Sequence, residues 1–366
     1  MFSSEVTEDN QDTEVTLIDL LNKCPDISSL IFSTNILILR QTSKTIYDML
    51  KNTNIRIAIT NKKDYEFSNQ EELSYKLNSL NTWCYVYKLY LLHCKLGDDG
   101  ARAIANALRV NSTLQTLDLF SNDIGADGTR AIAELLRVNT TLQSLDLGRN
   151  CIEDDGALAI AEALRVNSTL QTLDLKFNRV KDEGIRAIAE ALHVNSTLHA
   201  LIIGSNDIRD DGARAIADAL RVNSTLLSLD LSFNYMRADS VRAIAEALCV
   251  NSTLHSLNLE RNDIGADGTR AIAELLRVNT TLQSLDLGRN CMGDDEVRAI
   301  AEALRVNSKL QVLDLYGNNI GDDGALAIAE ALRVNTTLQK LDLRNNYVGY
   351  DVERALRESW NNRVEL

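Results

Sequence analysis

The chain has 366 residues, enough for two ordinary domains or one elongated one, and a formal net charge of −14. An acidic chain disfavours nucleic acid and anionic membranes, which are bound through clustered Lys and Arg, and it favours a basic protein partner. Aromatic residues make up 5% of the chain and Pro25 is its one proline, a composition that indicates stacked regular units rather than an irregular globule.

The first residues are polar and acidic, and we expect residues 1–14 to be a disordered tail. They have neither the basic nor the apolar region of a secretory signal, and no later stretch approaches 18 apolar residues. The six cysteines show no paired spacing, which suits reduced thiols. These features predict a cytoplasmic protein that binds no membrane, and we expect it to be a monomer.

Residues 15–82 differ in composition from the rest of the chain, and we expect a helical N-terminal cap there. Within them, "ILRQTSKTIYDML" at 38–50 resembles the second half of an F-box, although the usual Leu-Pro start is absent. Two interpretations stay open. The segment only covers the open end of the repeats that follow, or it also docks a Skp-type adaptor of a ubiquitin ligase. A capping box from Ser68 to Glu71 starts the helix that leads into the repeats.

Residues 83–350 are built from a repeat of 28 residues. Each unit contains L-x-x-L-x-L-x-x-N/C-x-I, as in "LQTLDLFSNDI" from Leu114, and this is the leucine-rich repeat signature. The asparagine of the pattern recurs at 122, 150, 178, 206, 234, 262, 290, 318 and 346, and Cys94 takes its place one period earlier. Ten consecutive units therefore stack along the chain.

Each unit predicts a short strand, a turn and a helix. The two leucines of L-x-L point inward and the residue between them faces out. In the second unit we expect Asp127 to cap the helix N-terminus, and Ile132, Ala133 and Leu136 to share its buried face. We expect Asn139 to end that helix in a left-handed conformation.

The 28-residue unit with a full helix resembles the ribonuclease-inhibitor-like class of leucine-rich repeats. "GALA" at 156–159 and 324–327 also resembles the GALA-type repeat proteins that some intracellular bacteria deliver into host cells. The resemblance implies an α/β horseshoe with a parallel sheet on the concave face and helices on the convex face. It also implies location in the host cytosol if the chain is such an effector. Residues 351–366, with Trp360, are expected to form a C-terminal cap helix.

Several motifs that suggest chemistry are explained by the repeat. Eight N-x-S/T sequons arise because Asn ends each helix and Thr leads into the next strand. Acidic pairs such as "GDDG" lack the alternating ligands of a calcium loop and suit a helix start. The four histidines have no Ser or Cys partner at a fixed offset. The sequence therefore predicts no enzyme, no catalytic residue, no metal and no cofactor.

The concave face carries an acidic ladder, which we define as the residues between the two strand leucines: Asp118, Asp146, Asp174, Asp230, Asp286, Asp314 and Asp342. Tyr90, Ile202 and Asn258 interrupt it. One interpretation is that Asp is simply common at this position in the class. The other is that the ladder attracts a basic partner.

Aromatic and basic residues gather in the turn that follows each strand. Phe177 and Phe233 lie two strands apart with Ser205 between them, beside Ile202. Because aromatic residues and Arg anchor many interfaces, we predict a partner site there, the rival interpretation being scattered exposed side chains. The predicted partner-binding residues are Arg149, Lys176, Phe177, Ile202, Phe233, Tyr235, Arg261 and Tyr316.

The leading hypothesis is a non-enzymatic scaffold that binds a protein partner on the concave face. The first alternative is an F-box-like substrate receptor of a ubiquitin ligase. The second is a GTPase-activating regulator, because activators of a nuclear-transport GTPase share this repeat type. No residue can be assigned that activating role.

Overall fold

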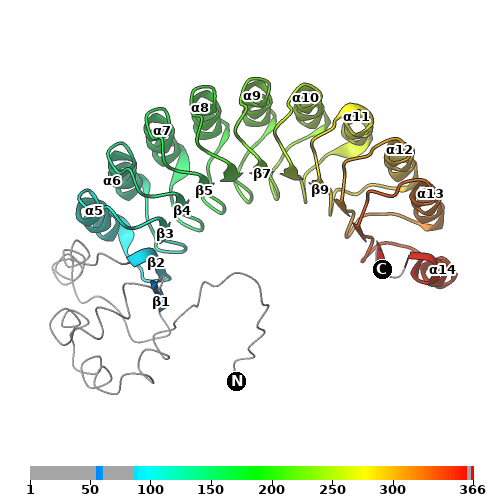
Figure 1. Cartoon of the computed structure of the whole chain (residues 1–366), viewed down its shortest axis with the longest axis horizontal. Coiled ribbons are helices and arrows are strands. Elements are labelled where there is room, and N and C mark those ends of the chain that lie inside the picture. The colour runs from blue at the N-terminus through cyan, green and yellow to red at the C-terminus, as the bar shows by residue number, and fades with distance from the viewer. Residues whose placement is uncertain (1–54, 61–85, 361–363) are drawn as a thin grey trace, which may run out of the picture.

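The computed structural model describes residues 55–60, 86–360 and 364–366. Over the repeats the chain follows an arc, with strands along its inner side and helices along its outer side (Figure 1). The horseshoe that the resemblance implies is confirmed. The proposed tail over 1–14 and the F-box-like stretch at 38–50 lie outside the described residues.

The strands form one parallel sheet in chain order, in which each pairs with the next. Equivalent residues of successive repeats face one another, as Leu117 faces Leu145, because the 28-residue period returns the chain to the same place. The strands are β1 (Ile55–Thr60), β2 (Val86–Leu92), β3 (Thr116–Asp118), β4 (Ser144–Asp146), β5 (Thr172–Asp174), β6 (Ala200–Ile202), β7 (Ser228–Asp230), β8 (Ser256–Asn258), β9 (Ser284–Asp286), β10 (Val312–Asp314), β11 (Lys340–Asp342) and β12 (Val364–Glu365).

A helix follows each strand from β2 to β11. These helices are α5 (Gly97–Leu108), α6 (Ala126–Leu136), α7 (Glu153–Leu164), α8 (Asp182–Leu192), α9 (Asp210–Leu220), α10 (Ala238–Leu248), α11 (Gly265–Val278), α12 (Asp294–Leu304), α13 (Asp322–Leu332) and α14 (Tyr350–Trp360). None of the helices in the described part of the chain has a long enough apolar run to cross a membrane.

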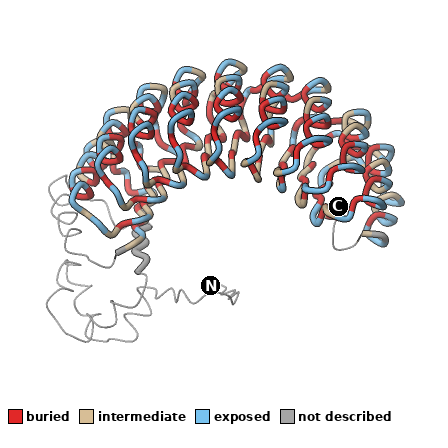
Figure 2. Tube along the Cα trace, turned by 45° about the horizontal axis from the view of Figure 1, so that its top comes forward, coloured by how far each residue is buried: buried red, intermediate tan, exposed pale blue. Residues whose placement is uncertain are grey.

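The core lies between the strand layer and the helix layer. In the second repeat the core contains Leu117 of β3, Leu119 just after β3, and Ile132 and Leu136 of α6. All four side chains are fully buried. Ala133 is buried beside them, as the sequence predicts, and its small side chain lets the helix approach the strands closely. Figure 2 shows this buried layer continuing from repeat to repeat between exposed outer surfaces.

The ends differ in part from the predicted helical caps. Ile55–Thr60 forms β1, which pairs with β2, so a helix over these six residues is wrong. The sequence "IRIAIT" alternates β-branched and other residues, a pattern that favours a strand. At the other end, where a cap helix over 351–366 is expected, α14 ends at Trp360 and β12 follows it, extending the sheet beside β11.

The recurring asparagine joins each repeat to its neighbours. The Asn150 side chain accepts hydrogen bonds from the backbone N–H groups of Asn122 and Ile124, both at 3.0 Å. Its amide donates to the carbonyl oxygens of Leu119 and Leu147, at 3.1 and 2.9 Å. This buried amide satisfies backbone groups of two repeats at once, in addition to the backbone bonds that link neighbouring turns, such as Ser121 N to Gly148 O at 2.9 Å.

Two predictions about the helix ends are wrong. Asp127 lies in the first turn of α6, and Gly125 is the capping residue. The carboxylate that serves this N-terminus is Asp98 of the previous repeat, which accepts from Gly125 N at 2.7 Å and Gly128 N at 2.9 Å. Asn139 does not adopt a positive φ. Its amide donates to Leu108 O of the previous repeat and its oxygen accepts from backbone N–H groups that follow it.

Candidate functional site

In each turn after β2 to β11, one equivalent residue lies in the left-handed region, and in four of these turns a second residue does so too: Lys95, Asp123, Arg179 and Cys291. The equivalent residues are those just before the recurring asparagine: His93, Ser121, Arg149, Phe177, Ser205, Phe233, Arg261, Arg289, Gly317 and Asn345. This conformation costs a bulky L-residue about 1–2 kcal/mol, and glycine adopts it freely. Gly317 shows that a glycine fits the turn, so the large side chains of Phe177 and Phe233 are not required by the backbone. Strained positions of this kind point to a role outside folding.

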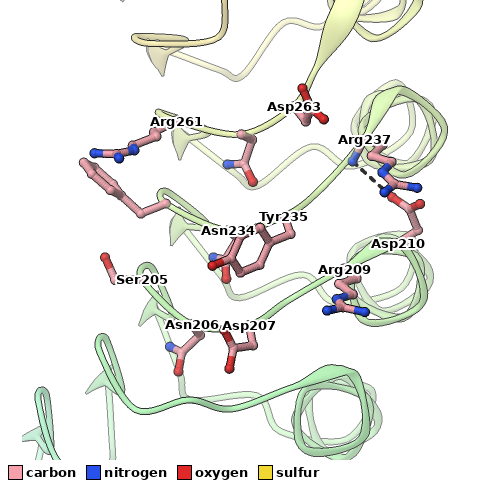
Figure 3. A pocket seen from close by; sticks show the side chains of 12 residues that line it. Ser205, Asn206, Asp207, Arg209, Asp210, Asn234, Tyr235, Arg237, Arg261 and Asp263 are labelled. Atoms are coloured by element: carbon pink, nitrogen blue, oxygen red, sulfur yellow. Dashed lines mark hydrogen bonds between the residues drawn. The ribbon is translucent and has the colours of Figure 1, made fainter.

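A hollow of about 850 Å³ opens beside the turns after β6, β7 and β8 (Figure 3). Phe233, Tyr235 and Arg261, three of the predicted partner-binding residues, line it. The Arg261 guanidinium lies 5.2 Å from the centre of the Phe233 ring, a cation–π contact, and Tyr235 is 60% exposed. The remaining lining residues are Ser205, Asn206, Asp207, Arg209, Asp210, Asn234, Arg237, Asn262 and Asp263.

Four predicted site residues lie towards the N-terminal side of this hollow and do not line it. Ile202 is half-buried in β6, beside Asp174 in the neighbouring strand. Lys176 bonds the Asp174 carboxylate at 2.8 Å. Phe177 is 51% exposed, and Arg149 is exposed one repeat further away. These residues continue the row of turns but do not form one pocket with Phe233.

Tyr316 belongs to a different group. Its ring lies 5.1 Å from the guanidinium of Arg289 and 6.0 Å from that of Arg344. Its hydroxyl accepts a hydrogen bond from the side chain of Asn345. The structure therefore separates Tyr316 from the hollow and places it in a second arginine–aromatic group near the C-terminal end.

The acidic ladder has a structural task. Asp146 Oδ1 accepts from Gly148 N at 2.7 Å and Asp286 Oδ1 from Gly288 N at 2.9 Å, two residues on in each case. Asn258 makes the same bond to Glu260 N at 2.9 Å. The side chain at this position therefore shapes the turn, which any Asx residue can do.

The ladder is also less anionic than its composition suggests. Burial, followed by the charge of Asp174, raises the pKa of Asp146 to about 7, although its bond from Gly148 N acts in the opposite direction. Burial likewise raises the pKa of Asp286 to about 7. Desolvation and crowding of like charges both disfavour ionised carboxylates. The ladder therefore offers a basic partner less negative charge than a count of carboxyl groups implies.

Arg209 and Arg237 are not among the partner-binding residues predicted from the sequence. Each precedes its helix as the capping residue, where most repeats have glycine. Aligning the helix starts at the 28-residue spacing is the signal that finds them. In Figure 3 both lie on the helix side of the hollow, across from Arg261.

Chemistry of other kinds has little support in the ranges that the structure describes. No group of three His, Cys, Asp or Glu residues there could hold a metal ion. Cys94, Cys151, Cys249 and Cys291 are free thiols. In these ranges, groups of several functional side chains lie on surfaces that suit contact with another molecule.

The strand, asparagine turn and helix, stacked along one parallel sheet, define a repeat solenoid. The family model for the leucine-rich repeat matches ten segments: 86–105, 110–133, 138–161, 166–189, 194–217, 222–245, 250–273, 278–301, 306–329 and 334–351. The chain therefore belongs to the leucine-rich repeat family.

Solved structures resemble the chain only in part. One is described as leiomodin-1 actin-binding site 2, with 22% sequence identity and a TM-score of 0.34. The match covers 50% of this chain and 88% of that one. No curated protein matches the sequence.

Proposed function

We propose that the protein is a non-enzymatic scaffold that binds a protein partner at the hollow beside the turns after β6, β7 and β8. The observation that carries this proposal is Phe233, a large aromatic held at φ 52° in a turn that accepts glycine. The repeat family supports a binding role, since solenoids of this kind present extended concave surfaces to partners.

The hollow has the composition of an interface anchor. Tyr235 and Phe233 supply aromatic surface with few rotatable bonds, and Arg261 stacks on the ring. Backbone hydrogen bonds fix this turn, because Phe233 N donates to Glu260 O at 2.7 Å and Tyr235 N to Ile208 O at 2.9 Å. A partner therefore meets a preformed surface and loses little free energy in ordering it.

The test begins by capturing partners from cytosol and identifying them by mass spectrometry. The affinity of the purified partner is then measured for the wild type and for Phe233→Ala/Tyr235→Ala. We expect the double variant to bind at least about 30-fold more weakly, roughly 2 kcal/mol. Tyr347→Ala/Tyr350→Ala is the matched control, because both tyrosines are 75% exposed and lie outside the hollow. Unchanged affinity in the Phe233/Tyr235 variant would rule out this site.

The Phe177→Ala/Phe233→Ala variant tests the wider site predicted from the sequence. A larger loss in this variant than in Phe233→Ala alone extends the site to the turn after β5. An equal loss confines it to the hollow.

The more specific functional hypotheses stay predictions. The ubiquitin-ligase hypothesis depends on residues 38–50, and capture of a Skp-type adaptor by the full chain but not by a chain lacking residues 1–54 supports it. Acceleration of GTP hydrolysis across a panel of small GTPases tests the regulator hypothesis. The ribonuclease-inhibitor-like subtype and the GALA-type effector role also stay predictions.

A further inference from the structure

The position just before each helix, or at its first residue in α5, α7 and α11, has an unusual distribution of residues. Along the repeats it is Gly97, Gly125, Glu153, Lys181, Arg209, Arg237, Gly265, Gly293, Gly321 and Gly349. Three consecutive repeats therefore carry a basic residue where seven others carry glycine or glutamate. We call Lys181, Arg209 and Arg237 the basic strip.

The backbone at this position needs only its N–H group. Arg209 N donates to Asp182 Oδ1 at 2.8 Å and Arg237 N to Asp210 Oδ1 at 3.0 Å. In a glycine repeat, Gly321 N makes the same bond at 2.7 Å to Asp294. Lys181, Arg209 and Arg237 have φ values of −105°, −116° and −109°, extended backbone that any residue adopts. The side chains of the strip therefore have no part in starting the helices.

The charges of the strip are exposed and available. All three side chains are exposed, and no ion pair to any of them occurs among the described residues. Some arginines on the helix surface are paired, as Arg214 is with Asp211 at 3.0 Å and Arg298 with Asp295 at 2.7 Å. A cation without a partner at a position that accepts glycine has no evident structural reason.

The strip also adjoins the hollow. Arg209 and Arg237 line it together with Arg261, which has no ion pair in the described part of the chain either. Three aspartates lie there too, and one of them, Asp210, is already bonded by Arg237 N and by the Ser240 hydroxyl at 2.9 Å. The hollow therefore suits a ligand whose negative groups are separated, because a continuous polyanion would meet Asp207 and Asp263.

We propose that the basic strip binds an acidic peptide segment of the partner, laid in extended form across the repeats of α8, α9 and α10. This deepens the proposed function and rests on it. Neighbouring strands are about 4.8 Å apart and packed helices about 8–10 Å, so successive members of the strip, which lie between these layers, are about 5–10 Å apart. An extended chain advances about 3.3–3.6 Å per residue, so an acidic group at every second or third residue matches the strip.

The test uses fluorescent 12-residue peptides with Glu at every third position, and versions with Gln, Lys or phosphoserine in place of Glu. Their binding to the full chain is measured by anisotropy at low and at 0.15 M salt. We expect the Glu peptide to bind at least tenfold more tightly than the Gln peptide, with an affinity that falls as salt is added. Comparison of the phosphoserine peptide with the Glu peptide shows whether the strip prefers phosphate or carboxylate groups, because the preferred group gives the tighter binding.

The variant Lys181→Gly/Arg209→Gly/Arg237→Gly takes its residues from the chain's own glycine repeats. We expect it to lose at least tenfold in affinity for the Glu peptide with its unfolding transition unchanged. Substitution of the same three residues by Gln provides a second variant that keeps the side-chain length. The control removes three exposed arginines, Arg109, Arg305 and Arg333, from the C-terminal ends of α5, α12 and α13.

Equal losses in the strip variant and the control would overturn the proposal, because they indicate general electrostatic attraction. Equal binding of the Gln or Lys peptide, no peptide binding, or tighter binding of a single-stranded oligonucleotide would also overturn it. The proposed function fails separately, when Phe233→Ala/Tyr235→Ala leaves the affinity for the purified partner unchanged.

Discussion

Residues 122–151 and 262–291 have the same sequence but begin their helices differently. In the first block α6 spans Ala126–Leu136 and Gly125 has φ −94°. In the second, α11 spans Gly265–Val278 and Gly265 has φ +61°. Local sequence cannot be the cause of this difference, so it must come from the neighbouring repeat.

The preceding repeat has a carboxylate at the critical position in the first block and an alanine in the second. Asp98 bonds Gly125 N and Gly128 N, whereas Ala238 stands at the equivalent position before Gly265. A second alanine, Ala126, precedes Glu153, which also has a positive φ of 54°. A helix N-terminus without a side-chain acceptor is less stable. In these two repeats Glu153 and Gly265 adopt a positive φ, and the helix starts at that residue, one position earlier than in α6. Ala266 stands at the equivalent position before Gly293, but Glu296 of the same repeat as Gly293 accepts from Gly293 N at 3.0 Å, and φ of Gly293 is −97°. A helix start therefore depends on the residue about one repeat earlier unless a carboxylate of its own repeat makes that bond.

The largest change is expected where the two blocks are alike. Asn150 and Asn290 each bond backbone groups of two repeats and are nearly fully buried. Replacement of either by Ala leaves several buried polar groups unpaired, and we expect a loss of about 3 kcal/mol or more in unfolding free energy. Urea denaturation measures it, with exposed Cys151→Ala as control. A loss near that of the control would show that water replaces these bonds.

The helix starts can be exchanged between the blocks. Asp98→Ala should cost about 1–2 kcal/mol, and Ala238→Asp should stabilise the protein by about 1 kcal/mol by bonding Gly265 N and Gly268 N. Denaturation gives the energies, and backbone chemical shifts of Gly125 and Gly265 report the sign of φ. If Gly265 keeps its positive φ in Ala238→Asp, the neighbouring carboxylate does not determine the helix start.

The blocks also share a pH response, through Asp146 and Asp286. In the folded state both carboxyls keep a proton up to a pKa of about 7, whereas the unfolded chain releases it near pH 4. The native state therefore binds more protons between these values, and stability should fall as pH rises from 4 to 7 and then level off. Asn at either position, as at Asn258, should flatten this slope and stabilise the protein at pH 8 by about 1 kcal/mol.

Thermal unfolding between pH 4 and 8 measures this response. Asp123→Asn is the control, because that carboxyl is exposed. A wild-type profile that rises from pH 4 to 7 would contradict the raised pKa values.

The smallest effect is expected at the turns, where both blocks hold arginines, Arg149 and Arg289, at positive φ. Phe177→Gly should be more stable than Phe177→Ala by up to about 1 kcal/mol, because glycine adopts the left-handed conformation without strain, as Gly317 does. Chemical denaturation of the two variants gives the comparison. A less stable glycine variant would mean that the turn carries no strain.

The period and the L-x-L pattern predicted the sheet, the helices and buried residues such as Ala133, because these depend on contacts repeated in every unit. The N-cap at Asp127 was predicted wrongly because the carboxylate that acts there comes from Asp98, in another repeat. A pattern within one repeat does not reveal a hydrogen bond to another repeat.

The proximity of three residues in the candidate site was also predictable. Phe233, Tyr235 and Arg261 line one hollow, since neighbouring turns are adjacent in a solenoid. Tyr316 does not join them because its turn follows β10, two repeats beyond that of Arg261. Its contacts with Arg289 and Arg344 are an arrangement of side chains that spacing alone does not reveal.

The bond from Asp98 to the following helix gives the solenoid a polarity. At α6, α8, α9 and α13 the capping carboxylate belongs to the earlier unit, so removing repeats from the N-terminal side deprives the next of these helices of its acceptor. Removal from the C-terminal side leaves the remaining helices capped. A repeat copied to a new place in the chain therefore takes the start of its helix from whichever unit precedes it, and gene duplication can change local backbone conformation without changing a residue of the copy.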